Sequence, residues 1–432
     1  MSGARIAVVV LGDLGRSPRM LYQALSLADS GAAVDLVGYR GSEPPRAVAG
    51  HPRIRLHRLP APRRLEARRG SLLWLDAVLR LVAQSVRLLW ILLARLPRPS
   101  AVLVQNPPPI PTLPAAWLAA RLRRARWVVD WHNLGPAVLA ETLGARHPLI
   151  AAARRCERVF GRRADAHLCV SRALADALAA RRGIAGAAVL YDRPPPRFAP
   201  TPAAGRAALL RRLGLDRLDP SRDDRDRDRP ALAVSPTSWT PDEDFTPLLD
   251  ALARYDAAAA GPQPPRLPPL VVAITGRGPL RERWRERFAA LGLSRVAVHT
   301  PWLEADDYPL LLGAADLGLC FHRSSSGLDL PMKLADLRGA GLPVCALDYG
   351  PVLAEVVRDG DDGLLFAGGE RLAGHLIALL AGFPAPNPLR DRLRRGAAEA
   401  ARIRWHDGWE REARPALERL VDLGVSSRRN FD

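Results

Sequence analysis

Short apolar runs followed by helical patterns recur along this 432-residue chain. The first run, Ile6 to Leu11, is rich in β-branched residues. Apolar residues at helical spacing follow it from Pro18 onward, with Ser17 as the expected N-cap. A buried strand followed by such a helix is the repeating unit of a parallel α/β sheet. Further strands of the first half are predicted at residues 33–37, 54–59, 102–105, 127–130, 166–170 and 189–191.

The pattern restarts after residues 221–230, a run of alternating Arg and Asp that is typical of a solvated linker. Strands of the second half are predicted at residues 231–234, 270–274, 296–298, 317–321 and 343–346. We therefore expect an α/β protein with two Rossmann-like parallel-sheet domains that face each other across a cleft. The expected boundaries are 1–200 for the first domain, 201–230 for the linker, 231–388 for the second domain and 389–432 for a helical tail.

The formal net charge of +18 comes almost wholly from Arg. Such an excess indicates an anionic partner, such as a phosphorylated substrate or a membrane surface, unless it reflects composition alone. The arginines are spread along the chain without a helix-turn-helix or RNA-binding signature, so nucleic acid is not expected as a partner. The four cysteines lack the spacing of zinc ligands, and neither a metal nor a cofactor is expected.

Residues 71–96 form the most unusual segment of the first half. Its apolar stretches contain Trp74 and Trp90, but arginines interrupt them too often for a helix that crosses a bilayer. Such a helix can lie on a membrane surface or cover the sheet, and the nearby Arg63, Arg64, Arg68 and Arg69 favour membrane contact. The N-terminal run has no signal-peptide cleavage region.

The turn after the first strand contains Gly12, Asp13, Gly15, Arg16 and Arg19. Glycine lets a backbone approach a ligand, and free amides at a helix start attract an anion. The spacing is a poor match to Gly-x-Gly-x-x-Gly, which disfavours a dinucleotide-dependent dehydrogenase. An ordinary tight turn also fits the pattern, but the two arginines favour an anion site.

A polar cluster, Asp130 to Asn133, follows the strand expected at 127–130. Enzymes with open sheets place reactive groups at such strand ends. His132 can act as a base or hold a phosphate oxygen, and Asp130 can act as a base or orient His132.

Two loops of the second half suit a diphosphate. Hydroxyl groups gather at residues 235–240, which include Ser238, although a turn would use the same residues. Residues 275–279 combine glycine flexibility at Gly278 with the guanidinium of Arg277, which can bind phosphate in a bidentate manner.

The segment from residue 324 to residue 336 is the strongest signal. We expect its Ser/Gly loop, Ser324 to Gly327, to begin a helix, so that amide groups point at an anion. Lys333 and Asp336 are three residues apart and share one face of that helix. A cation for phosphate and a carboxylate for ribose hydroxyls suit a nucleotide sugar, whereas the alternative is an ordinary surface ion pair.

Lys333-x-x-Asp336, followed by Gly-Ala-Gly-Leu-Pro-Val at 339–344, resembles the donor-site signature of GT-B glycosyltransferases, in which Glu commonly stands at the position of Asp336. Longer matching segments make the resemblance more specific. They lie at residues 10–20, 129–133, 237–240, 301–304 and 324–333. Together these strings resemble the chitobiosyldiphosphodolichol β-mannosyltransferases, from about residue 5 to about residue 415.

The resemblance implies a GT-B fold and metal-independent transfer of mannose from GDP-mannose to a lipid-diphosphate-linked N,N′-diacetylchitobiose, with inversion to a β-1,4 bond. The donor residues that it implies are Ser238, Arg277, Gly278, Ser324, Ser325, Ser326, Gly327, Lys333 and Asp336, with Trp302 and Leu303 beside the guanine. It implies that Gly12, Gly15, Arg16 and Arg19 face the acceptor. The candidate catalytic groups are Asp13, His132 and Asp130.

The chain departs from eukaryotic members of this family, which usually begin with a hydrophobic membrane anchor, and it carries the charged insert near residue 225. Another nucleotide-sugar donor or polyprenyl-linked acceptor therefore stays open, as does a non-catalytic scaffold that binds a nucleotide sugar. We expect a cytoplasmic protein peripheral at a membrane, on the cytosolic face of the endoplasmic reticulum or the inner face of a bacterial plasma membrane.

Overall fold

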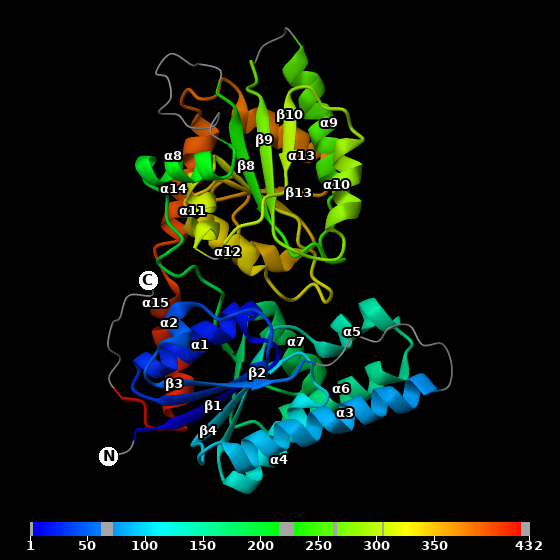
Figure 1. The fold of residues 1–432 in the computed structure, drawn as a ribbon, viewed down its shortest axis with the longest axis vertical. Helices are drawn as coiled ribbons and strands as arrows, with labels where there is room; N and C mark the ends of the chain where they lie inside the picture. The colour runs from blue at the N-terminus through cyan, green and yellow to red at the C-terminus, as the bar shows by residue number, and fades with distance from the viewer. Residues whose placement is uncertain (1–2, 62–71, 216–228, 262–265, 305, 425–432) are drawn as a thin grey trace. The chain divides into compact units, whose positions relative to one another are not determined.

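The computed structural model describes residues 3–61, 72–215, 229–261, 266–304 and 306–424. The chain divides into two compact units. The N-terminal unit comprises Met1–Asp192 with Trp405–Asp432, and the C-terminal unit comprises Arg193–Arg404. Each unit contains an open sheet of parallel strands covered by helices (Figure 1), which confirms the predicted α/β class.

Among the described residues, the N-terminal sheet has seven parallel strands in the order β3-β2-β1-β4-β5-β6-β7. They are β1 (Arg5–Asp13), β2 (Ala33–Tyr39), β3 (Ile54–Leu59), β4 (Ala101–Asn106), β5 (Arg126–Trp131), β6 (Ala166–Cys169) and β7 (Ala188–Val189). The helices of this unit are α1 (Pro18–Asp29), α2 (Arg46–Ala49), α3 (Leu72–Trp90), α4 (Thr112–Arg123), α5 (Gly135–Leu143), α6 (Pro148–Gly161), α7 (Arg172–Arg182), α15 (Trp405–Gly408) and α16 (Arg414–Glu418). The strand order reverses between β1 and β4, where open sheets bind ligands.

Within the described part of the C-terminal unit, six parallel strands run in the order β10-β9-β8-β11-β12-β13. They are β8 (Ala231–Pro236), β9 (Leu270–Thr275), β10 (Val296–His299), β11 (Leu317–Cys320), β12 (Val344–Leu347) and β13 (Leu364–Phe366). The helices are α8 (Ala203–Arg212), α9 (Thr246–Ala260), α10 (Arg281–Ala289), α11 (Asp307–Ala314), α12 (Met332–Gly339), α13 (Gly369–Leu380) and α14 (Pro388–Ala400). The sequence analysis missed β13, because a three-residue run is too short to show a period. In this second sheet the strand order reverses between β8 and β11.

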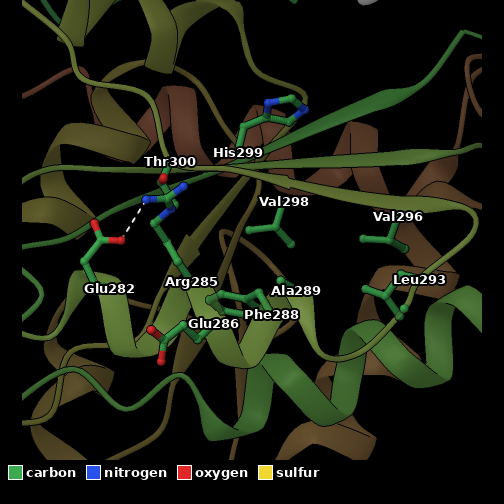
Figure 2. A pocket seen from close by; sticks show the side chains of 11 residues that line it. Glu282, Arg285, Glu286, Phe288, Ala289, Leu293, Val296, Val298, His299 and Thr300 are labelled. Carbon is green, nitrogen blue, oxygen red and sulfur yellow. Dashed lines mark hydrogen bonds and ion pairs between the residues drawn. The ribbon is translucent and has the colours of Figure 1, made fainter.

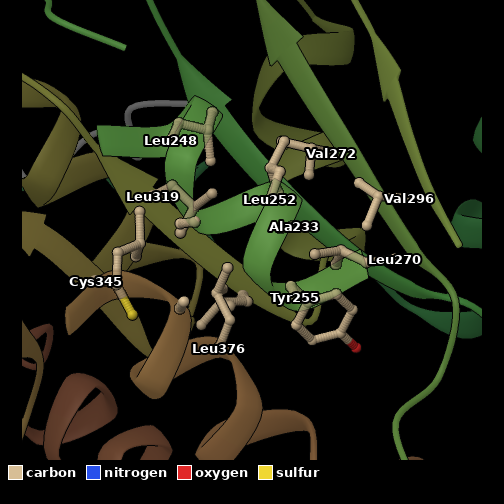
Figure 3. Packing of buried hydrophobic residues seen from close by; sticks show 14 of the residues in the cluster. Ala233, Leu248, Leu252, Tyr255, Leu270, Val272, Val296, Leu319, Cys345 and Leu376 are labelled. Atoms are coloured by element: carbon tan, nitrogen blue, oxygen red, sulfur yellow. The ribbon is translucent and has the colours of Figure 1, made fainter. Parts of the chain in front are cut away.

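The core of the C-terminal unit lies between its sheet and the helices α9 and α13 (Figure 3). Leu248, Leu252 and Tyr255 of α9 are fully buried, and their spacing puts them on one face of the helix. Leu376 of α13 packs in the same cluster. The Tyr255 hydroxyl donates a hydrogen bond of 2.9 Å to the Pro268 carbonyl, so no polar atom of this side chain is left unpaired in the core.

The C-terminal residues are shared between the two units instead of forming one tail. α14 belongs to the C-terminal unit, whereas the chain from Trp405 belongs to the N-terminal unit. Trp405 and Trp409 are fully buried, and their indole N–H groups donate to Ser26 Oγ at 3.0 Å and Gln23 Oε1 at 2.8 Å on α1. Burial of two indoles fixes these residues against α1. The expected linker contains α8, and its residues 216–228 lie outside the described residues.

The helix expected within residues 71–96 is present as α3, and its continuation, Ile91–Arg95, is π-helical. One local prediction needs correction. Ser17 occupies the N-cap position of α1, but its hydroxyl donates to the Asp13 carbonyl at 2.9 Å instead of accepting from the helix. In the described ranges, no helix is both long enough and apolar enough to span a bilayer.

Candidate functional site

Most of the predicted donor residues lie beyond the carboxyl ends of β8 and β11, at the strand-order reversal of the C-terminal sheet. The loop after β8 contains Ser238, and the segment after β11 contains Ser324 to Gly327 and Lys333. The two segments are neighbours because β8 and β11 pair in parallel. The backbone of residue 243 also forms an isolated antiparallel bridge with that of residue 322.

Glu243 lies at the centre of this region, although the sequence analysis did not single it out. It is 3% exposed and accepts hydrogen bonds from the Thr237 hydroxyl and, at 2.7 Å, from the Ser238 amide. Its other carboxylate oxygen accepts from the Lys333 ammonium group. A buried carboxylate requires such partners, since an unpaired buried charge is costly. Glu243 thereby joins the loop after β8 to α12.

Lys333 is the only lysine in the sequence. All the other residues among the 63 lysines and arginines are arginines. An ammonium group is a compact charge with three donors, whereas a guanidinium group is a wide planar fork. The Lys333 side chain is 23% exposed and lies against the buried Glu243. The position therefore combines a confined charge with enough access to meet a ligand.

The Ser324–Gly327 loop lies near Lys333 in sequence but does not begin the helix that carries it. α12 starts at Met332 with Pro331 at its N-cap, which corrects the predicted helix start. The amides of Gly327 and Leu328 donate to Ser324 Oγ at 2.9 and 3.2 Å, and the Ser324 hydroxyl donates to Asp329. The loop is therefore held by its own hydroxyl and by Asp329, and a helix dipole does not orient it.

Asp336 and Lys333 share a helix, but they do not form the surface ion pair that was the alternative explanation. Lys333 pairs with Glu243, whereas Asp336 accepts a hydrogen bond of 3.1 Å from the Tyr308 hydroxyl of α11. Both side chains are half-buried. Because they have separate partners, the cation and the carboxylate stay apart on the same helix, as a site for both a diphosphate and the neighbouring ribose would require.

The loops after β9 and β10 bring together the other predicted donor residues. The Arg277 guanidinium stacks on the Trp302 ring, 3.3 Å from its centroid, and Trp302 is 50% exposed. Leu303 beside it is buried. A Cβ atom at Gly278 would come within 1.7 Å of the Ser238 carbonyl oxygen, so only glycine permits this approach of the two loops.

A separate hollow of about 640 Å³ lies between α10 and the edge strand β10 (Figure 2). Phe288, Val296 and Val298 form its apolar wall, and Arg285 pairs with Glu282 at its rim. The predicted donor residues do not line it. This hollow is therefore distinct from the cluster beyond β8 and β11.

In the N-terminal unit, a buried ion pair joins Arg19 of α1 to Asp130 at the end of β5. The Arg19 guanidinium donates to both carboxylate oxygens at 2.9 and 3.0 Å, and it also pairs with Asp192 at 2.8 Å. Arg19 is 2% exposed and Asp130 is fully buried. Arg19 and Asp130 are thus enclosed and paired within the unit in this structure, and their predicted roles toward the acceptor stay predictions.

His132 combines solvent access with an orienting partner, whereas Asp130 is buried. Its ring is 21% exposed, and its Nε2 lies 3.2 Å from Asp130 Oδ2. Burial alone would raise the pKa of Asp130, but Arg19 and His132 outweigh it and hold that pKa well below its usual range. An ionised Asp130 stabilises the proton on Nε2, which leaves Nδ1 as the basic atom of the ring.

Asp13, the third candidate, has a structural role in this conformation. Its carboxylate accepts from the amide of Gly15 at 3.0 Å and from the amide and hydroxyl of Ser42. A Cβ atom at Gly15 would come within 2.4 Å of the Ser42 carbonyl oxygen, so glycine is needed there. Gly12 has more room, and Arg16 is exposed. Of the predicted acceptor residues, Arg16 therefore offers the accessible cation.

Two family descriptions match the two halves of the chain. Residues 15–192 match the description "Glycosyl transferase 4-like domain", and residues 240–382 match "Glycosyl transferases group 1". Solved structures agree on the fold at low sequence identity. Sucrose-phosphate synthase from Thermosynechococcus elongatus gives a TM-score of 0.66 at 16% identity, with 96% of this chain and 97% of that chain covered. Anabaena Alr3699/HepE in complex with UDP gives 0.60 at 15% identity, with 96% and 98% covered.

Relatives with much higher identity cover nearly the whole chain. The UDP-glycosyltransferase TURAN of Arabidopsis thaliana is 42% identical, with 96% of this chain and 98% of the relative covered. The chitobiosyldiphosphodolichol beta-mannosyltransferases of Mus musculus and Homo sapiens are 40% and 39% identical. Each alignment covers 95% of this chain, with 89% of the mouse and 92% of the human protein. The chain therefore belongs to the chitobiosyldiphosphodolichol beta-mannosyltransferase family of GT-B glycosyltransferases.

Proposed function

We propose that this protein is an inverting mannosyltransferase that transfers mannose from GDP-mannose to a lipid-diphosphate-linked N,N′-diacetylchitobiose and forms a β-1,4 bond. The observation that carries the proposal is the Lys333–Glu243 pair at the strand-order reversal of the C-terminal sheet, surrounded by hydroxyl groups and amides. The names of several relatives, which are chitobiosyldiphosphodolichol beta-mannosyltransferases, support the choice of donor sugar and acceptor.

In this proposal the C-terminal unit binds the donor. Lys333 and Arg277 neutralise the diphosphate, and Ser238 and the Ser324–Gly327 loop donate hydrogen bonds to its oxygens. Asp336 accepts from the ribose hydroxyls, and Trp302 with Leu303 borders the base. The exposed face of Trp302 and the stacked Arg277 suit a planar nucleobase and its phosphates.

The N-terminal unit supplies the general base. Nδ1 of His132 takes the proton of the acceptor hydroxyl while the acceptor oxygen forms a bond to the anomeric carbon. The bond from that carbon to the phosphate oxygen breaks on the opposite side, and the nucleoside diphosphate leaves with both electrons. Lys333 and Arg277 stabilise the charge that develops on the leaving group. Asp130 holds His132 in the orientation this step requires.

A lipid-linked acceptor requires that the protein reach a membrane surface, and α3 presents a suitable face. Val78, Val82, Val86 and Trp90 recur every four residues along α3, and each is 52–58% exposed. α4 packs beside α3 (Figure 1) and exposes Leu122 at 62%. These exposed apolar residues of two neighbouring helices are together named the α3–α4 face.

The charges around the α3–α4 face suit anionic lipids. From residue 78 to residue 129 the sequence contains eight arginines and no acidic residue. Arg80 and Arg87 line a hollow of about 490 Å³ on the adjacent side of α3. Apolar side chains flanked by arginines are typical of helices that lie in the membrane interface. We therefore propose a peripheral protein that acts at the cytosolic surface of a membrane.

The donor and acceptor can be tested directly with purified protein. GDP-mannose and a short-chain lipid-diphosphate chitobiose should give a trisaccharide whose new bond is β-1,4, determined by NMR of the product. UDP-glucose should give no product, since Trp302 and Leu303 are proposed to border guanine. Transfer from a UDP-sugar with none from GDP-mannose would instead favour a donor like that in the name of the Arabidopsis relative.

The single lysine permits a test of the donor site that needs no acceptor. An amine-directed acylating reagent can modify only Lys333 and the N-terminal amine, and peptide mass spectrometry separates the two. GDP should protect Lys333 while the N-terminal amine reacts as before. Lys333→Ala should weaken GDP binding by at least about tenfold, because it removes a charge-assisted hydrogen bond. Equal labelling with and without GDP would remove Lys333 from the donor site.

The role of His132 predicts a different effect from that of Lys333. His132→Ala should lower kcat by about 10²- to 10⁴-fold, the usual contribution of a general base. GDP affinity, measured by calorimetry, should stay unchanged, because His132 is not among the donor-binding residues. His147→Asn is a matched control: His147 caps α6 in the same unit, and Asn is a good N-cap residue. A normal kcat for His132→Ala would require another base.

The α3–α4 face predicts a defect in lipid binding that leaves the fold intact. The double variant Val82→Glu with Val86→Glu should bind vesicles containing phosphatidylserine at least about tenfold more weakly, because two exposed apolar side chains no longer enter the lipid. Leu310→Glu, at a 38% exposed leucine of the C-terminal unit, is the control. Sedimentation with vesicles measures both variants, and equal binding would place the membrane contact elsewhere.

A further inference from the structure

A histidine that the proposed mechanism does not use lies inside the donor-side cluster of the C-terminal unit. His322 follows β11, and its side chain is 16% exposed. Its Nδ1 lies 3.3 Å from Asp242 Oδ2 in the loop after β8. Its Nε2 lies 3.4 Å from Asp329 Oδ2 in the segment before α12. The ring therefore bridges two loops that come from different parts of the chain.

The surroundings leave the ring little freedom to turn away from these carboxylates. The amide of Arg323 donates to the Asp242 carbonyl at 2.8 Å, which pairs the backbone of the two segments. Tyr349 packs its ring edge-on against His322, with the ring centroids 5.9 Å apart. The Tyr349 hydroxyl donates to the Asp329 carbonyl at 2.8 Å, so the same tyrosine also holds the second loop.

The two carboxylates favour a protonated ring, since each ring nitrogen lies within 3.4 Å of a carboxylate oxygen. A neutral imidazole has one N–H donor and one lone pair, and here the lone pair would face a carboxylate. Burial lowers the pKa of His322, but Asp242 and Asp329 outweigh this effect and the nearby Lys333, and they raise that pKa to about 9. Asp242 responds in the opposite sense: burial would raise its pKa, but His322, Thr240 and Lys333 hold it below its usual range.

The bridge extends from His322 to the loop proposed to bind the donor. Asp329 uses its other carboxylate oxygen to accept from the Ser324 hydroxyl. Ser324 Oγ in turn accepts from the amides of Gly327 and Leu328. A change at His322 therefore reaches the Ser324–Gly327 loop through one carboxylate and one hydroxyl group.

We propose that His322 is a positioning residue of the donor site, which as a cation joins Asp242 to Asp329 and so holds the Ser324–Gly327 loop in the conformation that receives the diphosphate. This inference rests on the proposed function, because it takes that loop to be part of the nucleotide-sugar site. His322 touches two carboxylates and contributes one positive charge. Without that charge, Asp242 and Asp329 would lose the cation between them and would stand as two negative groups beside an incoming anion.

The first test is the affinity for GDP, measured by calorimetry with the full-length chain. His322→Gln should raise the Kd for GDP and the KM for the donor by about tenfold or more, because the cation between two carboxylates is lost. The value of kcat at saturating donor should change much less, since the loop positions the donor and does not take part in bond breaking. His375→Gln is the matched control. His375 is a half-buried histidine of α13 whose Nε2 lies 3.0 Å from the Leu365 carbonyl oxygen.

A second variant separates charge from shape. Adding Asp329→Asn to His322→Gln removes the carboxylate that faced the lost cation, while the Asn oxygen can still accept from Ser324. The double variant should recover much of the lost GDP affinity. A histidine that only filled space would show no such recovery, and unaltered GDP binding in His322→Gln itself would overturn the proposal.

The charge state has its own test, which needs no ligand. A histidine whose pKa rises from 6.5 to about 9 on folding stabilises the protein fully below pH 6.5. It loses that contribution as the pH rises through about 9. The melting temperature of the wild type should therefore exceed that of His322→Gln at neutral pH, and the difference should shrink by about pH 10. A difference that stays constant with pH would contradict the bridging cation.

The two proposals can fail separately. If the wild-type protein does not bind GDP, the proposed donor is wrong, and the comparison of melting temperatures still tests the ion cluster. If the wild type binds GDP and GDP protects Lys333, the proposed donor site is supported. If His322→Gln then binds GDP equally well, the role assigned to His322 is wrong.

Discussion

In each sheet a buried carboxylate at the carboxyl edge is paired with a cation from a distant part of the sequence. Asp130 pairs with Arg19 across 111 residues, and Glu243 pairs with Lys333 across 90 residues. Removing one partner of such a pair leaves an uncompensated charge in a medium of low dielectric, at a cost of about 3–5 kcal/mol. The two pairs therefore fix the positions of the loops that surround them, and the proposed chemistry depends on those positions.

The two pairs differ in what they leave accessible. The Arg19–Asp130 pair is almost fully enclosed, and only His132 extends from it toward solvent. The cluster in the C-terminal unit has Asp242, Glu243 and Asp329 as carboxylates and His322 with Lys333 as cations. The proposed diphosphate site is therefore surrounded by charge of both signs. In this proposal, hydroxyl and amide groups of the serine- and glycine-containing loops supply much of the recognition.

The unit that contains His132 is built from both ends of the chain. Trp409 donates to Gln23, and Gln23 donates to Asp130 at 3.2 Å, so residues near the C-terminus reach the carboxylate that orients His132. A truncation before Trp405 would remove two buried indoles from α1. The C-terminal segment therefore belongs to the N-terminal unit, and it helps to hold the carboxylate that orients the proposed base, His132.

The sequence alone determined the two parallel sheets, because alternating apolar runs and helical periods have few other ways to bury their surfaces. It also indicated His132, Lys333 and the Ser324–Gly327 loop, since polar groups directly after buried strands gather at one sheet edge. Only the tertiary structure decided which charges pair. It assigned Arg19 to Asp130 and Lys333 to Glu243, and it made Asp13 a hydrogen-bond acceptor for Ser42. The physical reason is that ion pairs form between residues close in space, and no local pattern in the sequence records which distant carboxylate a cation will meet.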